Sequence, residues 1–492
     1  MSDTSADPAA SPGTDGPMSD VQPDVQADVQ PEVRFETRMS DADALMWAIE
    51  KDPMLRSTIT TLVVVDGAVD RDDLWRTFDR VSRVVPRLRQ RVRSNPLSLA
   101  PPRWEVDPNF DLGYHLRFAR VPGDGTMRDL LSMAQPMAMQ GFDRARPQWE
   151  CTVADGLDGG RSALILKIHH AITDGVGGVR LMLELFDMDP RATERPMPAE
   201  PPVHVMNQVE RFTDAVQHQT RRQLGIVKRL ATDSAGNVMG MLSDPPGTYE
   251  STAELLSSVA RIMRPVSQPL SPLMSGRSLS NHLDVVTLPL DLAKKAGKRI
   301  GGTLNDTFVS GLALGLQRYH EQHGIELDAL RMGMPINVRT AGTAETAGNA
   351  FVPARFEIPL GADDPLDLMR DIRSRMVAAR DEPANQLVEL LSNVLNRLPT
   401  TVVTQIFGTM MKGLDFQASN VPGAPVPVYL LGVPVHSIVP FGPLAGAASN
   451  VTLLSYQNDL SIGINVDPAA VPDTGVYVDC IRGAYDEILA LA

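Results

Sequence analysis

The sequence predicts a mixed α/β (α+β) fold in two subdomains, and three observations support this class. The chain has 492 residues, which is too long for one ordinary hydrophobic core. Strand and helix patterns alternate in an N-terminal part and again in a C-terminal part, as in layered α/β proteins. A proline-rich and then helical stretch separates the two parts. We therefore expect a tail, a first subdomain, a connector and a second subdomain at residues 1–36, 37–190, 191–280 and 281–492.

The first segment, residues 1–36, is predicted to be a disordered acidic tail. It is rich in Asp, Pro, Ser and Ala, and it contains the near-repeat VQPD-VQAD-VQPE. Such a composition cannot bury enough apolar surface to offset the entropy lost on ordering. We expect this tail to aid solubility.

The first subdomain, residues 37–190, opens with a helix start. Ser40 can cap this helix, and Asp43, three residues on, completes a capping box. Apolar spacing predicts a second helix over 72–85. Strand patterns occur at residues 59–65, 114–118, 149–153 and 163–170.

Two further segments complete the predicted architecture. In the connector, residues 191–280, helical patterns cover 205–230 and 251–262. In the second subdomain, residues 281–492, Thr303 and Asp306 have capping-box spacing and begin an amphipathic helix. Strands are expected at residues 283–288, 331–338, 351–358 and 451–456, with another amphipathic stretch at 387–398.

Charge and cysteine content limit the function classes. The net charge is −14. Residues 1–38 carry −6 of it, so about −8 remains for the folded part, which argues against nucleic acid as a partner. Cys151 and Cys480 fit no metal or redox spacing, and a cytoplasmic location is predicted. The sequence contains no uninterrupted run of eighteen apolar residues, so no membrane span is predicted. Peripheral contact with a membrane stays open.

The most specific chemistry lies in the segment 168–178, IHHAITDGVGG. Neighbouring side chains on a strand point to opposite faces, so His169 and His170 do not converge on one metal ion, and we expect no metal site. One imidazole can then act at a cavity while the other packs inward. Asp174 either caps the following helix or pairs with a buried arginine.

The same segment is an HHxxxDG motif and resembles the acyl-CoA-dependent acyltransferase superfamily, which includes chloramphenicol acetyltransferase and condensation domains. Within it, the chain from about Met39 onward is similar to the bacterial wax ester synthase/diacylglycerol acyltransferase family. The supporting marks are SDADA at 40–44, WEVDP at 104–108, FD at 110–111, DRARPQWE at 143–150, LND at 304–306, PINVR at 335–339, GN at 348–349, SNVPG at 419–423 and SY at 455–456. One departure is Gln148, where the family usually has leucine.

The resemblance implies two chloramphenicol-acetyltransferase-like subdomains joined by a helical connector, with the reaction centre between them. It makes His170 the general base of a direct acyl transfer, with an imidazole pKa suited to that task. His169 and Asp174 are expected to set the geometry, and Asp174 is expected to pair with Arg339. The other expected roles are active-site support by Gly175, Arg339, Asn305 and Asp306, and substrate binding by Trp149, Asn305 and Asn349. For Asn305 and Asp306, a role only in starting a helix is an equal alternative.

The implied function is O-acyl transfer from acyl-CoA to a lipid alcohol, giving triacylglycerol from diacylglycerol, wax ester from a fatty alcohol, or both. The resemblance implies no cofactor besides the co-substrate acyl-CoA. It implies a peripheral position on a membrane or lipid droplet, with a homodimer left open. Two alternatives are a polyketide- or peptide-type acyltransferase that uses a carrier-protein thioester, and a non-catalytic lipid-droplet protein. Because of Gln148, the acceptor alcohol is also left open.

Overall fold

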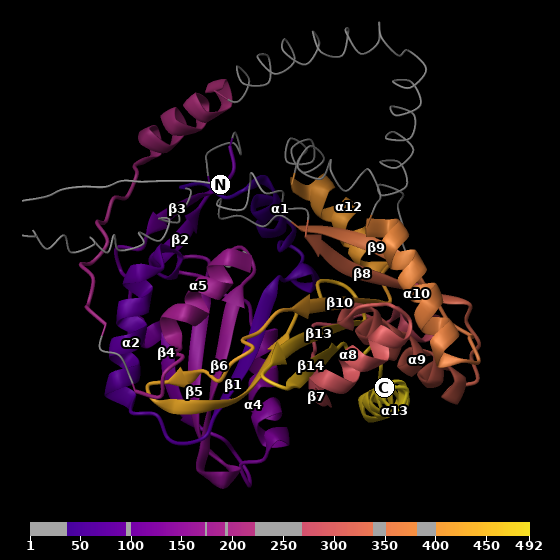
Figure 1. Ribbon diagram of the computed structural model, residues 1–492. Helices are drawn as coiled ribbons and strands as arrows, with labels where there is room; N and C mark the ends of the chain where they lie inside the picture. The colour runs from indigo at the N-terminus through magenta and orange to yellow at the C-terminus, as the bar shows by residue number, and fades with distance from the viewer. Residues whose placement is uncertain are drawn as a thin grey trace, which may run out of the picture.

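The computed structural model of this chain contains two six-stranded sheets with helices packed on them (Figure 1). The mixed α/β class predicted from the sequence is confirmed. The structure describes residues 37–94, 100–172, 175–191, 195–221, 268–337, 351–380 and 400–492. The predicted tail 1–36 and the expected helical stretches 251–262 and 387–398 lie outside these residues.

The first sheet has the strand order β11-β12-β1-β6-β5-β4. At its centre, β1 pairs antiparallel with β6, and β6 pairs antiparallel with β5. The strands and helices contributed by the first subdomain are α1 (Asp41–Ile49), β1 (Thr58–Val65), α2 (Arg71–Val84), β2 (Gln90–Arg93), β3 (Arg103–Val106), α3 (Leu112–His115), β4 (Leu116–Arg120), α4 (Met127–Met139), β5 (Trp149–Leu157), β6 (Arg161–His169) and α5 (Gly175–Leu185). The short β2 and β3 form a separate hairpin.

Helices cover both faces of the first sheet because its central strands are apolar on both sides. Leu74 and Phe78 of α2 belong to one core with Leu164 of β6, on the face that α5 also covers. On the other face, Leu130 of α4 belongs to a core with Leu62 of β1. Nearly every residue of β6 is buried, which is the pattern of a strand enclosed on two sides.

The second sheet has the order β7-β14-β13-β10-β8-β9, and the pairs β10–β13 and β10–β8 are parallel. Its elements are β7 (His282–Pro289), α8 (Leu290–Arg299), α9 (Leu304–Gln322), β8 (Ala329–Asn337), β9 (Phe351–Pro359), α10 (Pro365–Arg380), α12 (Thr400–Lys412), β10 (Phe416–Val421), β13 (Ser449–Tyr456), β14 (Asp459–Val466) and α13 (Thr474–Leu489). The long helix α9 packs against α8, α10 and α13. Together with the sheet, these helices enclose the largest core.

Two strands from the predicted C-terminal subdomain, residues 281–492, join the first sheet. β12 (Val433–Phe441) pairs antiparallel with β1, and β11 (Tyr429–Leu430) pairs with β12. Val439 lies opposite Leu62, so the two chain halves share a core. The sequence did not reveal this arrangement because it depends on pairing between distant residues, such as Thr60 with Phe441.

The described part of the connector is fastened to the first subdomain. Residues 208–221 are helical, within the predicted helical stretch 205–230. On this helix, Asp214 forms ion pairs with Arg38 and Arg103, and Ala215 is fully buried. Among the helices that the structure describes, none has the length and hydropathy needed to cross a membrane.

Candidate active site

The histidine pair lies where β6 ends. His169 is the last residue of the strand and is 1% exposed. Its Nδ1 accepts the backbone N–H of Ala171 at 3.0 Å, and its Nε2 lies 2.9 Å from Oε1 of Glu50. Because Nδ1 is an acceptor, the ring proton belongs on Nε2, toward the carboxylate. His169 is thus fixed in both position and tautomer.

Two aromatic rings complete the surroundings of His169. Trp47 of α1 meets the imidazole at 5.4 Å between ring centroids, and Phe142 meets it at 6.3 Å, both edge to face. Such contacts restrict rotation of the ring. This environment suits a residue that holds the local geometry, the role that the sequence suggested for one of the two histidines.

His170 has different surroundings. Its backbone N–H donates to the carbonyl of Ser57 at 2.9 Å, and its side chain is only partly enclosed. Desolvation and the neighbouring His169 lower the pKa of His170 to about 4. A hydrogen bond to its own backbone raises the pKa but does not offset them. The imidazole is therefore uncharged at neutral pH, with one ring nitrogen unprotonated, which a proton acceptor requires.

The helix α5 follows the histidines and begins at Gly175 of the motif. Asp174 and Arg339 lie outside the described residues, so their expected ion pair stays a prediction. Asn349, expected to bind substrate, also lies outside them.

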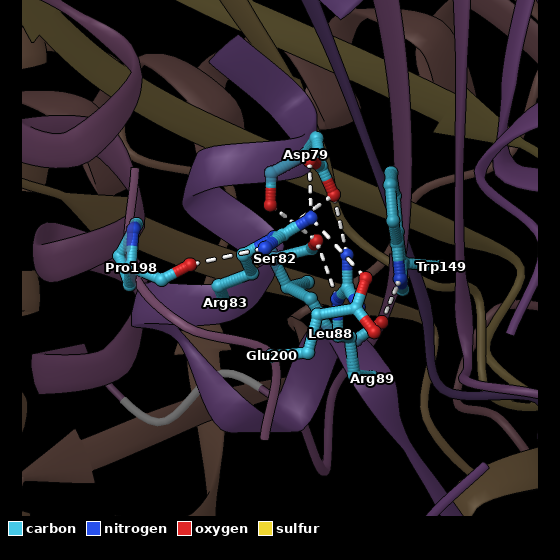
Figure 2. A network of polar contacts seen from close by, with 8 residues as sticks. All are labelled: Asp79, Ser82, Arg83, Leu88, Arg89, Trp149, Pro198 and Glu200. Atoms are coloured by element: carbon cyan, nitrogen blue, oxygen red, sulfur yellow. Dashed lines mark hydrogen bonds and ion pairs between the residues drawn. The ribbon is translucent and has the colours of Figure 1, made fainter. Parts of the chain in front are cut away.

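Trp149, for which the sequence suggested a role in substrate binding, lies in the core of the first subdomain. The indole is 1% exposed and stacks between Phe78 and His115. Its Nε1–H donates to the carbonyl of Leu88 at 2.8 Å (Figure 2). Since the ring is covered on both faces and its donor is used, it presents no surface to a substrate.

A polar network that includes Arg89 lies next to Leu88 in the chain. Arg89 donates to Asp79 and Ser82, and Arg83 also donates to Asp79 (Figure 2). Glu200 of the connector accepts from Arg83 at 3.2 Å. The network joins α2, the turn before β2 and the connector around the indole.

Gln148, the departure from the family pattern, is also buried, at 2% exposed. Its Nε2 donates to the carbonyls of Asp143 at 2.8 Å and Arg146 at 2.5 Å. The backbone carbonyl of Gln148 accepts the backbone N–H of His169 at 3.0 Å. The side chain therefore closes the loop before β5, and only its backbone contacts the histidine segment.

Asn305 and Asp306 stand at the start of α9 but make different contacts. Asp306 accepts the N–H and hydroxyl of Thr303 at 2.7 and 2.9 Å, which is the helix-start role left open by the sequence. Asn305 instead faces the end of β10, where its Oδ1 accepts from Nδ2 of Asn420 at 3.5 Å. The structure thus joins two motifs 115 residues apart.

Known proteins and protein families are similar to this chain over most of its length. Residues 39–308 match the model of the wax ester synthase/diacylglycerol acyltransferase catalytic domain, and residues 347–489 match that of the WS/DGAT C-terminal domain. A putative diacylglycerol O-acyltransferase of Mycobacterium tuberculosis is 35% identical over 459 residues, which cover 92% of this chain and 93% of the relative. The chain belongs to the wax ester synthase/diacylglycerol acyltransferase family. It is therefore an acyltransferase.

Other similarities agree with membership of this family. A probable diacylglycerol O-acyltransferase of the same bacterium is 25% identical over 462 residues, covering 90% of this chain and 94% of that protein. The structure of a wax ester synthase/diacylglycerol acyltransferase from Marinobacter aquaeolei has a TM-score of 0.60 at 19% identity, covering 92% of this chain and 98% of that one. The first condensation domain of the calcium-dependent antibiotic synthetase has a TM-score of 0.56 at 15% identity, covering 93% and 97%. These two structures confirm the expected fold.

The sequence analysis did not identify two residues that contact the motifs of this wax ester synthase/diacylglycerol acyltransferase family member. Glu50 touches His169, but it lies outside every motif that we identified. Asn420 lies within the SNVPG mark, which could have identified it, although nothing in the sequence paired it with Asn305. Both contacts are made in space between segments that lie more than 100 residues apart.

Proposed function

We propose that this enzyme transfers a fatty acyl group from acyl-CoA to the hydroxyl of a lipid alcohol, with His170 as general base. The supporting observation is the contrast within the pair, since both ring nitrogens of His169 are held by Glu50 and Ala171, while the side chain of His170 is only partly enclosed and is uncharged at neutral pH. The acceptors that we propose are diacylglycerol and long-chain fatty alcohols. The named relatives are putative or probable diacylglycerol O-acyltransferases, which supports the first of these.

In this mechanism the hydroxyl oxygen of the acceptor attacks the thioester carbonyl as His170 takes the hydroxyl proton. The Nδ1 atom of His170 is enclosed, so we assign Nε2 as the atom that receives the proton. The carbon–sulfur bond then breaks, and the CoA thiolate takes the proton back from the imidazolium. The products are an ester and free CoA thiol. General-base assistance of this kind contributes typically 10²–10⁴-fold to the rate.

The proposal is tested with purified enzyme, palmitoyl-CoA and either dioleoylglycerol or hexadecanol. We expect stoichiometric release of free CoA and formation of triacylglycerol, wax ester or both. CoA release only in the presence of an alcohol supports direct transfer. No CoA release with either alcohol would contradict the proposal and favour a non-catalytic lipid-droplet protein. Transfer only from an acyl carrier-protein thioester would favour the polyketide- or peptide-type alternative.

We also propose that the described connector places the enzyme on a lipid surface. Val209, Phe212 and Val216 are 74%, 46% and 41% exposed and have the spacing of one helix face. Val203 and Val205, just before the helix, are also exposed. The other side of the helix is held to the protein by Asp214, so the apolar side points away from the body.

A flotation assay with triolein droplets coated with phosphatidylcholine tests this surface. The wild-type enzyme is expected to float with the droplets, and the double variant Val209→Asp/Phe212→Asp is expected to stay in the aqueous phase. The matched control is Val377→Asp, which alters a similarly exposed valine on α10. Equal flotation of the double variant and the wild type would contradict the assignment.

A further inference from the structure

Glu50, the residue that follows α1, has a half-buried carboxylate with several partners. Its Oε1 accepts the backbone N–H of Ser57 at 2.5 Å and lies 2.9 Å from Nε2 of His169. Its Oε2 lies 3.7 Å from the guanidinium of Arg144. One carboxylate therefore joins the end of α1 to the start of β1 and the end of β6.

The contacts of Glu50 continue to the backbone of His170 through Ser57. The N–H of Ser57 is held by Glu50, and the carbonyl of the same residue accepts the N–H of His170 at 2.9 Å. A second route passes through His169, whose Nδ1 accepts the N–H of Ala171. Residues on both sides of His170 are thus fixed, directly or through one neighbour, by the same carboxylate.

The charge state of Glu50 suits this role. Burial raises the pKa of Glu50, but the contacts with His169, Ser57 and Arg144 outweigh burial, so the pKa is lower than usual. Glu50 is therefore ionised at neutral pH and accepts charge-assisted hydrogen bonds, which are about twice as strong as neutral ones. Without an acceptor at this place, the buried N–H of Ser57 would lose its partner.

We propose that Glu50 is a positioning residue for acyl transfer, which holds the backbone of His170 in place through Ser57 and His169. This inference rests on the proposed role of His170 as the base. Proton transfer is sensitive to placement, because the base must lie within hydrogen-bond reach of the hydroxyl that it deprotonates. Glu50 therefore affects the rate of the chemical step and has little effect on substrate binding.

The test compares Glu50→Ala with Glu50→Gln, because glutamine keeps an oxygen acceptor at the same place. We expect Glu50→Ala to lower kcat about 10- to 100-fold with KM for acyl-CoA and alcohol changed by less than about threefold. Glu50→Gln is expected to restore most of kcat. The matched control is Glu105→Ala, which removes a buried carboxylate that pairs with Arg93 in the β2–β3 hairpin. It is expected to keep kcat within about twofold of the wild type.

A double-mutant cycle separates this inference from the proposed function. If Glu50 acts through His170, Glu50→Ala lowers activity little further in a His170→Ala background. An equal loss in both backgrounds, a change confined to KM, or an unchanged kcat in folded Glu50→Ala would overturn the inference. Full activity of His170→Ala would instead overturn the assigned base.

If Glu50→Ala does not unfold cooperatively, it is not properly folded, and Glu50→Asp takes its place in the test. Aspartate keeps the charge but is one methylene shorter, so it cannot reach both Ser57 and His169 in the same way. We expect a reduced kcat with KM nearly unchanged, and a kcat equal to that of the wild type would overturn the inference.

Discussion

The hydroxyl of Tyr456, at the end of β13 in the second sheet, donates to the carbonyl of Val435 in the first sheet at 3.0 Å. The same hydroxyl accepts the backbone N–H of Val428 at 3.1 Å. Val428 directly precedes β11 and Val435 lies near the start of β12, so Tyr456 contacts both arms of the hairpin that joins the first sheet. It belongs to the SY mark recognised in the sequence, and the structure gives that mark a physical role.

Tyr456→Phe is expected to lower the free energy of unfolding by about 2 kcal/mol, because two buried backbone groups lose their partner. Urea denaturation of the variant and the wild type measures this difference. Tyr429→Phe on β11 is the control, since the contacts of Tyr429 with Asp187 are made by backbone atoms. Equal losses in the two variants would argue against the role of the Tyr456 hydroxyl.

His170→Ala is expected to lower kcat by at least about 100-fold in a folded protein, because the proton acceptor is removed. Steady-state release of CoA gives kcat, and thermal unfolding establishes that the variant is folded. His436→Ala, which changes an exposed histidine on β12, is expected to leave kcat unchanged. Near-normal activity of folded His170→Ala would remove the assignment.

The pH dependence of kcat/KM reports the protonation of His170 in the free enzyme. Since the pKa of His170 is lowered to about 4, kcat/KM should stay constant from neutral pH down to about 5 and fall to half near pH 4. The loss has this direction because the protonated imidazole cannot accept the hydroxyl proton. A half-point near pH 6.5 would show that desolvation does not control this histidine.

His115 links pH to stability. Burial lowers its pKa to about 4, despite a hydrogen bond to the carbonyl of Trp149 that raises it. Between pH 6.5 and 4 the unfolded chain binds more protons at this site than the native protein does, so the stabilisation is fully present above pH 6.5 and is lost as the pH falls. A shift of this size corresponds to about 3 kcal/mol.

His115→Phe is expected to reduce that pH dependence, because phenylalanine can keep the stacking with Phe110 and Trp149 without taking up a proton. His170 contributes a loss of the same sign, so part of the dependence should persist. Denaturant unfolding at several pH values between 4 and 7 measures it. The same slope in both proteins would contradict the assignment.

Gln148→Leu restores the usual family residue and tests whether this position selects the acceptor. We expect the free energy of unfolding to fall by about 1 kcal/mol, because the carbonyls of Asp143 and Arg146 lose a donor. The ratio of activities with diacylglycerol and hexadecanol should change by less than about twofold, since the side chain is enclosed in its own loop. A large change in that ratio would assign Gln148 to the acceptor path instead.

Local patterns predicted elements whose ends are marked by short-range chemistry. The box formed by Ser40 and Asp43 starts α1, and the box formed by Thr303 and Asp306 starts α9. Alternation along β6 suggested different roles for His169 and His170, and their surroundings do differ. Patterns of this kind are readable because they depend on residues only a few positions apart.

The position of β12 and the burial of Trp149 were not predictable in this way. Residues 428–448 read as an apolar stretch broken by prolines, and their pairing with β1 depends on a strand far away in the chain. Trp149 belongs to a recognised motif, and only its stacking with Phe78 and His115 shows that this residue makes a core contact here.

The sequence by itself determined the family, the mixed α/β class and the histidine pair, because motifs and periodicity are local properties of a chain. Only the tertiary structure decided which groups surround those histidines. Glu50 reaches His169 because α1 packs beside the end of β6, and Asn420 reaches Asn305 because β10 ends beside the start of α9. Such contacts follow from packing between distant segments, which no local pattern encodes.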